Sequence, residues 1–202
     1  MKNIADITLD DVKSIMASKG YPITTKEGVP NIVGIRNADK SSDIFIDRIW
    51  VWWNERGKEV SHFYTATTRP GFWYLEHPIN NDGTGILVPG HYPNCWGLGM
   101  HRKQQFALCQ KDGNGNMKAY RDKNLNNTID CNPSTIQDGQ FGCDGHHAGM
   151  DDGENIGHYS AMCQVWRFHK AHEDLMAEFD RMSKAYHYKY FSYTLLLQED
   201  FI

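Results

Sequence analysis

A histidine pair and a cysteine near the C-terminal end carry the residue types needed for nucleophilic catalysis by a thiol. His146 and His147 end the segment 142–147, and a glycine-bearing loop leads from them to a Ser160-x-x-Cys163 turn. A cysteine nucleophile needs an imidazole that accepts its proton and backbone N–H groups aimed at the developing oxyanion. His146 lies 17 residues before Cys163 and His147 lies 16 before it, which suits two adjacent strands joined by a loop. The sequence therefore predicts Cys163 as nucleophile, one imidazole as its base, and Ser160 as a hydrogen-bonding residue of the turn.

The order of these residues resembles the active-site segment of the L,D-transpeptidase catalytic domain, the YkuD-like fold. In that family a strand ending in Ile-His is followed about 16–18 residues later by Ser-His-Gly-Cys. A divergent branch, frequent in phages, has Ser-Ala-Gly-Cys-Gln-Val after a strand ending in Asn-Ile-His, and this chain is more similar to that branch. Ala161 stands where most of the family has histidine, and Met162 replaces a glycine. If that position needs positive φ, a methionine there is strained by about 1–2 kcal/mol; otherwise the turn differs.

The register of this resemblance distinguishes the two histidines. Asp144-Gly145-His146 stands in the place of Asn-Ile-His and selects His146, whereas the 16-residue spacing of some family members selects His147. Consecutive side chains of a strand point to opposite faces, so only one imidazole is expected to meet Cys163. The resemblance covers most of the chain, through the segments 31–37, 67–71, 89–92 and 120–122.

The resemblance implies a cysteine-dependent acyl transferase or hydrolase of the L,D-transpeptidase or carboxypeptidase type, phage-like in sequence, that acts on peptidoglycan stem peptides. Cys163 would attack the carbonyl of an L,D-linked residue, and His146 would serve as base and then as acid for the leaving amine. The candidate substrate-binding residues are Gly145, His158, Gln164 and Arg121. A thiol paired with histidine in this way is expected to alkylate at pH ~6, below the ~8.5 of an ordinary cysteine.

The alternative function is non-enzymatic. A virion or cell-wall-binding structural protein could keep the fold and bind wall material or other virion proteins. The changes at Ala161 and Met162 motivate this alternative.

A metal site is the second kind of site to consider. Oxygen-bearing side chains fall at positions 1, 3, 5 and 9 of a calcium-type loop, at Asp122, Asn124, Asn126 and Asp130. Position 12 is a proline, so the bidentate glutamate is missing, and an Asn/Asp-rich turn that caps its own backbone explains the pattern as well. The thiol chemistry requires no cofactor, which leaves calcium as the candidate ion.

Other histidines and cysteines allow two further interpretations. A zinc site would need convergence of Cys143, His146, His147, His158 and Cys163, although no common zinc-ligand spacing is present. His91 and His101 flank Trp96 in an aromatic, glycine-rich region, where they either line the substrate cleft or lie on the surface.

Composition and charge limit the possible partners and compartment. The formal charge is −4 and no basic run is present, so nothing favours nucleic acid as a partner. Five cysteines without a C-x-x-C pair predict free thiols in a protein made in the cytoplasm. The polar N-terminus does not resemble a signal peptide, and no apolar run is long enough to span a membrane. A wall enzyme of this kind would act at the cell wall after release, or as part of a phage particle.

The periodicity of the sequence predicts a mainly β domain with a short N-terminal helix and one amphipathic helix near the C-terminus. The resemblance implies that the strands form an L,D-transpeptidase-like curved sheet or β-sandwich. One domain spans 1–202, divided into an N-terminal helix and lead-in (1–24), a β-rich body with the His/Cys site (25–166), and a helix and closing strand (167–202). A capping box at Thr8–Asp11 begins the first helix, and Gly20 ends it. Strands are expected at 31–36, 44–53, 60–65, 71–75, 85–88, 105–110 and 190–197, and the second helix at 167–186.

Overall fold

The computed structural model describes residues 1–149 and 153–202. Its helices are α1 (Leu9–Ser18), α2 (Phe72–Glu76) and α3 (His169–Ala185), with short 3-10 turns at Ile4–Asp6, Gln110–Asp112, Pro133–Thr135 and Gln198–Asp200. Its strands are β1 (Asn31–Arg36), β2 (Asp47–Glu55), β3 (Lys58–Thr67), β4 (Thr84–Leu87), β5 (Gly90–His101), β6 (Gln105–Cys109), β7 (Met117–Asp122), β8 (Gln137–Gly139), β9 (Gly145–His147), β10 (Gln164–Trp166) and β11 (Tyr190–Leu197).

Eight of these strands close into a mixed barrel in the order β1-β11-β5-β6-β9-β10-β3-β2. Most neighbouring pairs are antiparallel, but β1 pairs with β11, and β9 with β10, in parallel. The two antiparallel hairpins, β2–β3 and β5–β6, are therefore linked by β11 and β1 on one side and by the short β9–β10 pair on the other. Because this pair is one of the two links, the segment that carries His146 and Cys163 is part of the barrel wall.

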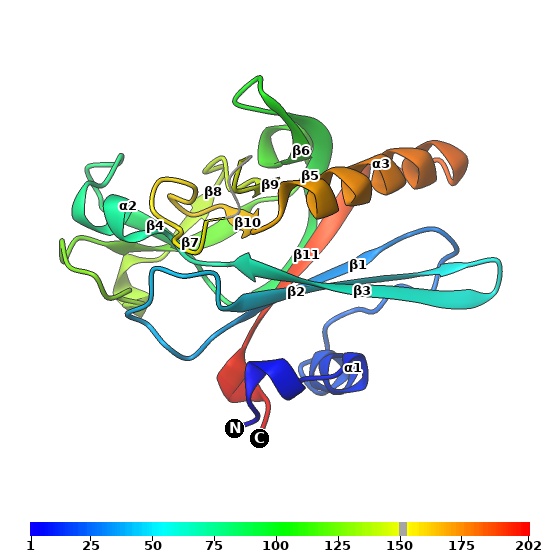
Figure 1. Cartoon of the computed structure of the whole chain (residues 1–202), viewed down its shortest axis with the longest axis horizontal. Coiled ribbons are helices and arrows are strands. Elements are labelled where there is room, and N and C mark those ends of the chain that lie inside the picture. The colour runs from blue at the N-terminus through cyan, green and yellow to red at the C-terminus, as the bar shows by residue number, and fades with distance from the viewer. Residues whose placement is uncertain (150–152) are drawn as a thin grey trace.

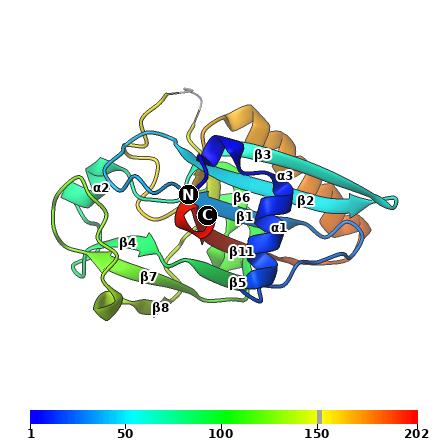
Figure 2. The same ribbon diagram turned by 90° about the horizontal axis from the view of Figure 1, so that it is seen from below.

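The two longer helices cover opposite sides of the β1–β2–β3 sheet (Figure 1). Val12 and Met16 of α1 pack with Val33 and Trp50 of the sheet, which forms one hydrophobic core. The apolar face of α3 belongs to the larger core, which also contains barrel residues such as Trp166. Seen from below, α1 crosses the strands and the two termini lie together (Figure 2), where the Lys2 N–H donates to the Phe201 carbonyl at 2.7 Å.

A second sheet, in the order β4-β7-β8, lies beside the barrel at the end that carries α2 (Figure 1). Segment 71–75, which we expected to be a strand, forms most of α2 instead, so that prediction was wrong. Leu75 packs with Ile86 and Ile129, whereas Trp73 on the other side of the turn is 44% exposed. Gly71 donates to the Ser160 carbonyl at 2.9 Å, and a Cβ there would lie 2.2 Å from the Gly157 carbonyl oxygen. The 157–160 loop thus occupies the space that a neighbouring strand would need.

The mainly β class, the short N-terminal helix and the amphipathic C-terminal helix are confirmed. The capping box is present, with Thr8 and Asp11 bonding each other's backbone N–H groups. We expected a curved sheet or a sandwich, and the structure shows that eight strands, including two parallel pairs, close into a barrel beside a small second sheet. Within the described ranges no helix is long and apolar enough to cross a membrane.

Candidate active site

The parallel pairing of β9 and β10 decides which side chains share a face. Val165 is opposite His146, and Gln164 is opposite Gly145. Since paired residues of parallel strands point to the same face and neighbours alternate, His146 lies on the face that Cys163 and Val165 share. His147 lies on the other face, toward α3, where its ring centroid is 5.5 Å from that of His172. The structure thus brings His146, and not His147, to the face of the cysteine.

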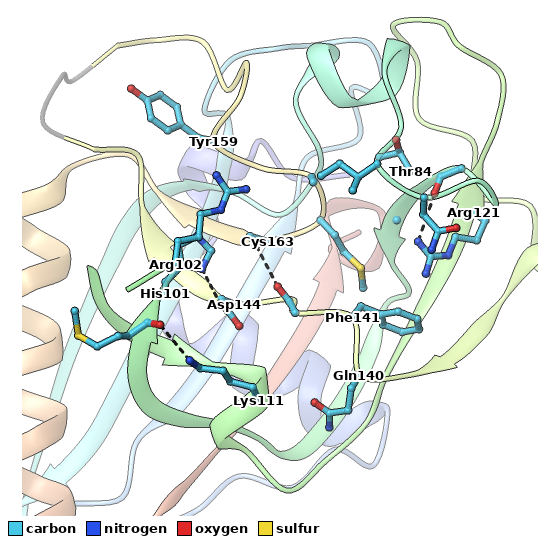
Figure 3. Close-up of a pocket in the computed structure, with 18 residues that line it drawn as sticks. Thr84, His101, Arg102, Lys111, Arg121, Gln140, Phe141, Asp144, Tyr159 and Cys163 are labelled. Atoms are coloured by element: carbon cyan, nitrogen blue, oxygen red, sulfur yellow. Dashed lines mark hydrogen bonds and ion pairs between the residues drawn. The ribbon is translucent and has the colours of Figure 1, made fainter. Parts of the chain in front are cut away.

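Cys163 lies directly before β10, in a hydrogen-bonded turn at the wall of a cleft. The Ser160 hydroxyl, fully buried, donates to the Cys163 carbonyl at 2.8 Å and closes the turn. Met162 does not have a positive φ, so it is not strained; its side chain packs against Gly85. The Cys163 thiol is oriented toward the Gly142 carbonyl, with a distance of 3.5 Å between Sγ and the oxygen (Figure 3).

The His146 imidazole is held in the tautomer that a general base requires. Its Nδ1 lies 2.9 Å from the His147 carbonyl oxygen, which can only accept, so Nδ1 carries the proton. Nε2 then carries the free lone pair; it is buried and has no hydrogen-bond partner among the described residues. Burial lowers the pKa of His146 well below its ordinary value, and the nearby His101 lowers it further. The imidazole is therefore neutral, with a free lone pair on Nε2, and its lowered pKa makes it a weaker proton acceptor than an ordinary histidine.

A second imidazole, His101 at the end of β5, stacks on His146. The two ring centroids are 4.0 Å apart and the ring planes differ by 13°. His101 Nδ1 is 2.7 Å from Asp144 Oδ2, while Asp144 Oδ1 accepts the Gln110 N–H at 2.8 Å. His101 lines the cleft (Figure 3), so it is a second candidate base and one whose orientation a carboxylate fixes.

The resting thiol is neutral. Burial raises the pKa of Cys163 to about 12 and the Asp144 charge adds to the shift, although the backbone N–H of Asp144, the Arg102 guanidinium and the Cys163 N–H act in the opposite direction. The pKa values of Cys163 and His146 thus move apart, in the directions that disfavour a thiolate–imidazolium pair. The expectation of alkylation at pH ~6 is not supported by this environment.

We accordingly expect native Cys163 to react with iodoacetamide about 100-fold or more slowly at pH ~8 than the same cysteine in the urea-denatured chain. The thiolate is the reactive form, and its fraction falls as the pKa rises, so the native rate should increase steadily with pH from pH ~8 upward. Peptide mass spectrometry of timed samples measures both rates. A native rate that levels off below pH ~7 would instead show a thiolate stabilised by a histidine.

The cleft beside Cys163 has a volume of about 500 Å³ and is rich in cations. Arg102 and Lys111 line it together with Arg121, whose guanidinium lies 5.0 Å from the Phe141 ring centroid. Figure 3 places Arg102 on one side of Cys163 and Arg121 on the other. Asp144, already bonded to His101, is the acidic residue among the lining side chains. A positive cleft in a chain of net charge −4 favours an anionic ligand.

The four candidate substrate-binding residues are not all at this cleft. Arg121 lines it, but Gln164 is fully buried behind it, where its amide oxygen accepts the Tyr193 hydroxyl at 2.7 Å. A Cβ on Gly145 would contact Trp166 and Leu108 of the core. His158 lies outside the lining of the cleft, with its ring 4.4 Å from that of Trp73. The structure therefore gives Gln164 and Gly145 roles in barrel packing.

The candidate calcium loop is bonded to itself. The Asp122 carboxylate accepts the Asn124 and Asp130 N–H groups at 2.9 and 2.8 Å, and Asn126 accepts the Thr128 N–H at 2.9 Å. The side chains of Asn124 and Asp130 bond each other at 3.2 Å. The Asp122–Asn124 and Asn126–Thr128 bonds are Asx-type turns, and the bonds to Asp130 close the loop on itself, which explains such a sequence without an ion. No group of three or more His, Cys, Asp or Glu residues with metal-site geometry occurs in the described part of the chain.

The five residues considered for zinc do not converge. Cys143 points into the barrel core, where its thiol contacts the Met162 carbonyl at 3.4 Å, and His147 faces α3. All five cysteines are free thiols.

His101 and Arg102 are the main cleft residues that reasoning from the sequence placed poorly. His101 was one of two histidines expected either at the cleft or on the surface, and the other, His91, lies away from the cleft and bonds Thr194 Oγ1 at 2.9 Å. Arg102 and Lys103 lie in the β5–β6 turn with φ of 47° and 61°, a conformation that usually takes Asn or Gly.

Comparison of the chain with protein-family models, curated proteins and solved structures finds no match.

Proposed function

We propose that the protein is a cysteine-dependent acyl transferase or hydrolase of the L,D-transpeptidase type, acting on peptidoglycan stem peptides. The observation that carries the proposal is the His146 imidazole. Its Nδ1–H is fixed by a backbone carbonyl, its ring lies on the face that bears Cys163, and its buried Nε2 has no hydrogen-bond partner among the described residues. A base with its tautomer fixed in this way, on the strand face of a thiol that lines a cleft, supports acyl transfer through a thioester. The assignment of the barrel to the L,D-transpeptidase-like fold belongs to the same proposal.

In the proposed reaction, the Cys163 thiol rotates away from the Gly142 carbonyl and attacks the peptide carbonyl. Its proton passes to His146 Nε2 as the S–C bond forms, which suits a neutral pair better than a preformed thiolate. The N–H groups of Asp144 and Cys163, which interact favourably with the sulfur, are the candidate donors to the oxyanion. His146 then protonates the leaving amine as the C–N bond breaks. An incoming amine or water releases the acyl group from sulfur and returns the proton to the thiol.

The charge of the cleft supports a stem peptide as the acyl donor. Stem peptides carry free carboxylates, and Arg102 and Arg121 lie on opposite sides of Cys163 (Figure 3). Arginine binds carboxylates through two parallel N–H bonds, which fixes orientation as well as affinity. We infer that the two guanidiniums hold carboxylates on either side of the attacked carbonyl.

The direct test is intact-protein mass spectrometry after incubation with a carbapenem or a stem tetrapeptide. We expect one acyl adduct per chain, located on Cys163 by peptide mapping, and none on the Cys163→Ser variant. Cys131→Ser, which removes a half-buried thiol outside the cleft, is the matched control and should acylate normally. A folded wild-type protein that forms no adduct with either probe would count against the enzyme.

The second candidate is a non-enzymatic wall-binding or virion protein. Two observations favour it: the Cys163 thiol bonds to the Gly142 carbonyl instead of an imidazole, and its pKa is raised. A cationic cleft would still bind anionic wall peptides under this alternative. Retention of the protein on purified cell walls, combined with no adduct on Cys163, would favour this alternative over the enzyme.

Under either proposal the protein acts at the cell wall after release or within a phage particle.

A further inference from the structure

Two buried arginines, Arg36 and Arg69, lie near a single carboxylate, that of Asp47, at the end of β1. Arg69, 1% exposed, pairs with Asp47 at 2.9 Å and donates to the carbonyls of Asn37 and Asp39. Both Asp47 oxygens are in use, since Oδ1 also accepts the Asn37 N–H and Oδ2 accepts the N–H and hydroxyl of Thr68. Arg36 has no carboxylate partner within the described residues. The buried cluster therefore carries one positive charge in excess.

The unpaired charge has a definite location. Arg36 is 3% exposed; its Nε donates to the Thr68 hydroxyl at 3.2 Å and one terminal nitrogen donates to the Thr68 carbonyl at 2.6 Å. The other terminal nitrogen, Nη1, is buried and has no hydrogen-bond partner among the described residues. A buried guanidinium with an unused N–H pair is costly unless an acceptor is supplied, because arginine does not give up its proton in proteins.

A small cavity of about 100 Å³ adjoins this arginine. Tyr120, Cys131 and Lys40 line it with Arg36, so the cavity has a hydroxyl and an ammonium as further donors. Glu199, an exposed residue, also lines it, and with Lys40 it marks the opening to solvent. The volume exceeds that of a single water, which takes about 30 Å³ in the liquid, and it is large enough for one small oxyanion.

Cys131 does not neutralise the excess charge. Burial raises its pKa, an effect that the charges of Arg36 and Lys40 reduce without reversing. The thiol is therefore protonated at neutral pH and remains an uncharged part of the cavity wall. Glu199 is exposed and its charge offsets that of Lys40 at the opening, so the counter-ion for Arg36 must come from outside this group of residues.

We propose that the cavity at Arg36 is a binding site for a small inorganic oxyanion of the phosphate class. Arg36 Nη1, the Tyr120 hydroxyl and Lys40 Nζ would donate hydrogen bonds to its oxygens, and the anion would neutralise the excess charge of the Arg36–Asp47–Arg69 cluster. Charge-assisted bonds to guanidinium and ammonium groups are the strong interactions that such anions form. The site lies outside the Cys163 cleft, so it does not depend on the proposed acyl transfer.

Cys131 is part of the cavity wall, so its alkylation rate reports whether phosphate occupies the site. We expect saturating inorganic phosphate, at constant ionic strength in potassium chloride, to lower the alkylation rate of Cys131 to about a tenth, because the bound ion fills the cavity that the reagent must enter. Cys109 lines neither this cavity nor the cationic cleft, so it is the comparison cysteine and should react at an unchanged rate. Peptide mass spectrometry measures both cysteines in the same sample. An equal effect on both, or no effect on Cys131, would overturn the proposal.

Three variants distinguish a specific phosphate site from nonspecific electrostatic effects of the added anion. Tyr120→Phe removes one donor without changing the cavity wall, and Lys40→Met removes an exposed charge, so neither should unfold the protein. Each should raise the phosphate Kd, read from Cys131 protection, by about tenfold. Lys58→Met, at the far β2–β3 turn, is the matched control and should leave the Kd unchanged. Equal phosphate affinity in all three variants and the wild type would exclude these donors and with them the site.

Discussion

We expect His146→Ala to slow acylation of Cys163 by about 10²–10⁴-fold, the usual loss when a general base is removed. His146 is the imidazole on the cysteine's face, and the His147 carbonyl fixes its proton on Nδ1. His147→Ala should acylate at close to the wild-type rate, because that side chain points toward α3. Both rates are measured with the same carbapenem, in samples quenched at timed intervals and analysed by intact-protein mass spectrometry. The two variants form a matched pair, since they remove the same group from adjacent positions of one strand.

His101→Ala is the variant that tests the competing assignment. His101 lines the cleft and is oriented by Asp144, so it is the next candidate for the base. If His101→Ala loses acylation and His146→Ala retains it, the base is His101 and His146 only supports its ring. Near-ultraviolet circular dichroism shows whether each variant keeps its packing. Added imidazole gives a second measurement, because it should restore part of the rate only where the missing ring was the base.

The face of each histidine could be predicted from the sequence, because alternation along a strand follows from backbone geometry alone. His146 and His147 had to point in opposite directions once they lay in a strand, and the parallel pairing with β10 adds which one shares the face of Cys163. The pairing of His101 with Asp144 could not be predicted in this way. It joins residues 43 positions apart and depends on how β5, β6 and β9 associate in the barrel.

The strand β5 could not be predicted over its full length, because it contains glycines, which usually indicate turns. Gly97 and Gly99 lie inside this strand because the 110–112 turn packs against it: a Cβ on Gly97 would lie 2.0 Å from the Asp112 carbonyl oxygen. Glycine signals close approach of another segment here, which local sequence cannot distinguish from a turn. Closure of the barrel was unpredictable for a similar reason. It depends on the parallel pairing of β1 with β11, at opposite ends of the chain.

We expect Asp47→Ala to lower the free energy of unfolding by about 3–5 kcal/mol, the cost of breaking a buried ion pair by removing one partner. Asp47 is 1% exposed, pairs with Arg69, and also acts on Arg36 through its charge. Without it two buried guanidiniums lack a counter-charge, and the N–H groups of Asn37 and Thr68 lose their acceptor. Since small domains have only about 5–15 kcal/mol of stability, a large share of the protein would be unfolded under mild denaturation.

The measurement is urea denaturation followed by fluorescence, with Asp138→Ala as the matched control. Asp138 is exposed, so its removal should change the free energy of unfolding by no more than about 0.5 kcal/mol. If Asp47→Ala does not unfold at a markedly lower urea concentration than Asp138→Ala, the two arginines are not held in a buried, charge-paired cluster. Asp47→Asn separates charge from shape. The Asn37 and Thr68 N–H groups bond different oxygens of Asp47, so asparagine keeps an acceptor for one of them and removes the negative charge. Its loss of stability therefore combines one hydrogen bond with the counter-charge that Arg36 and Arg69 require.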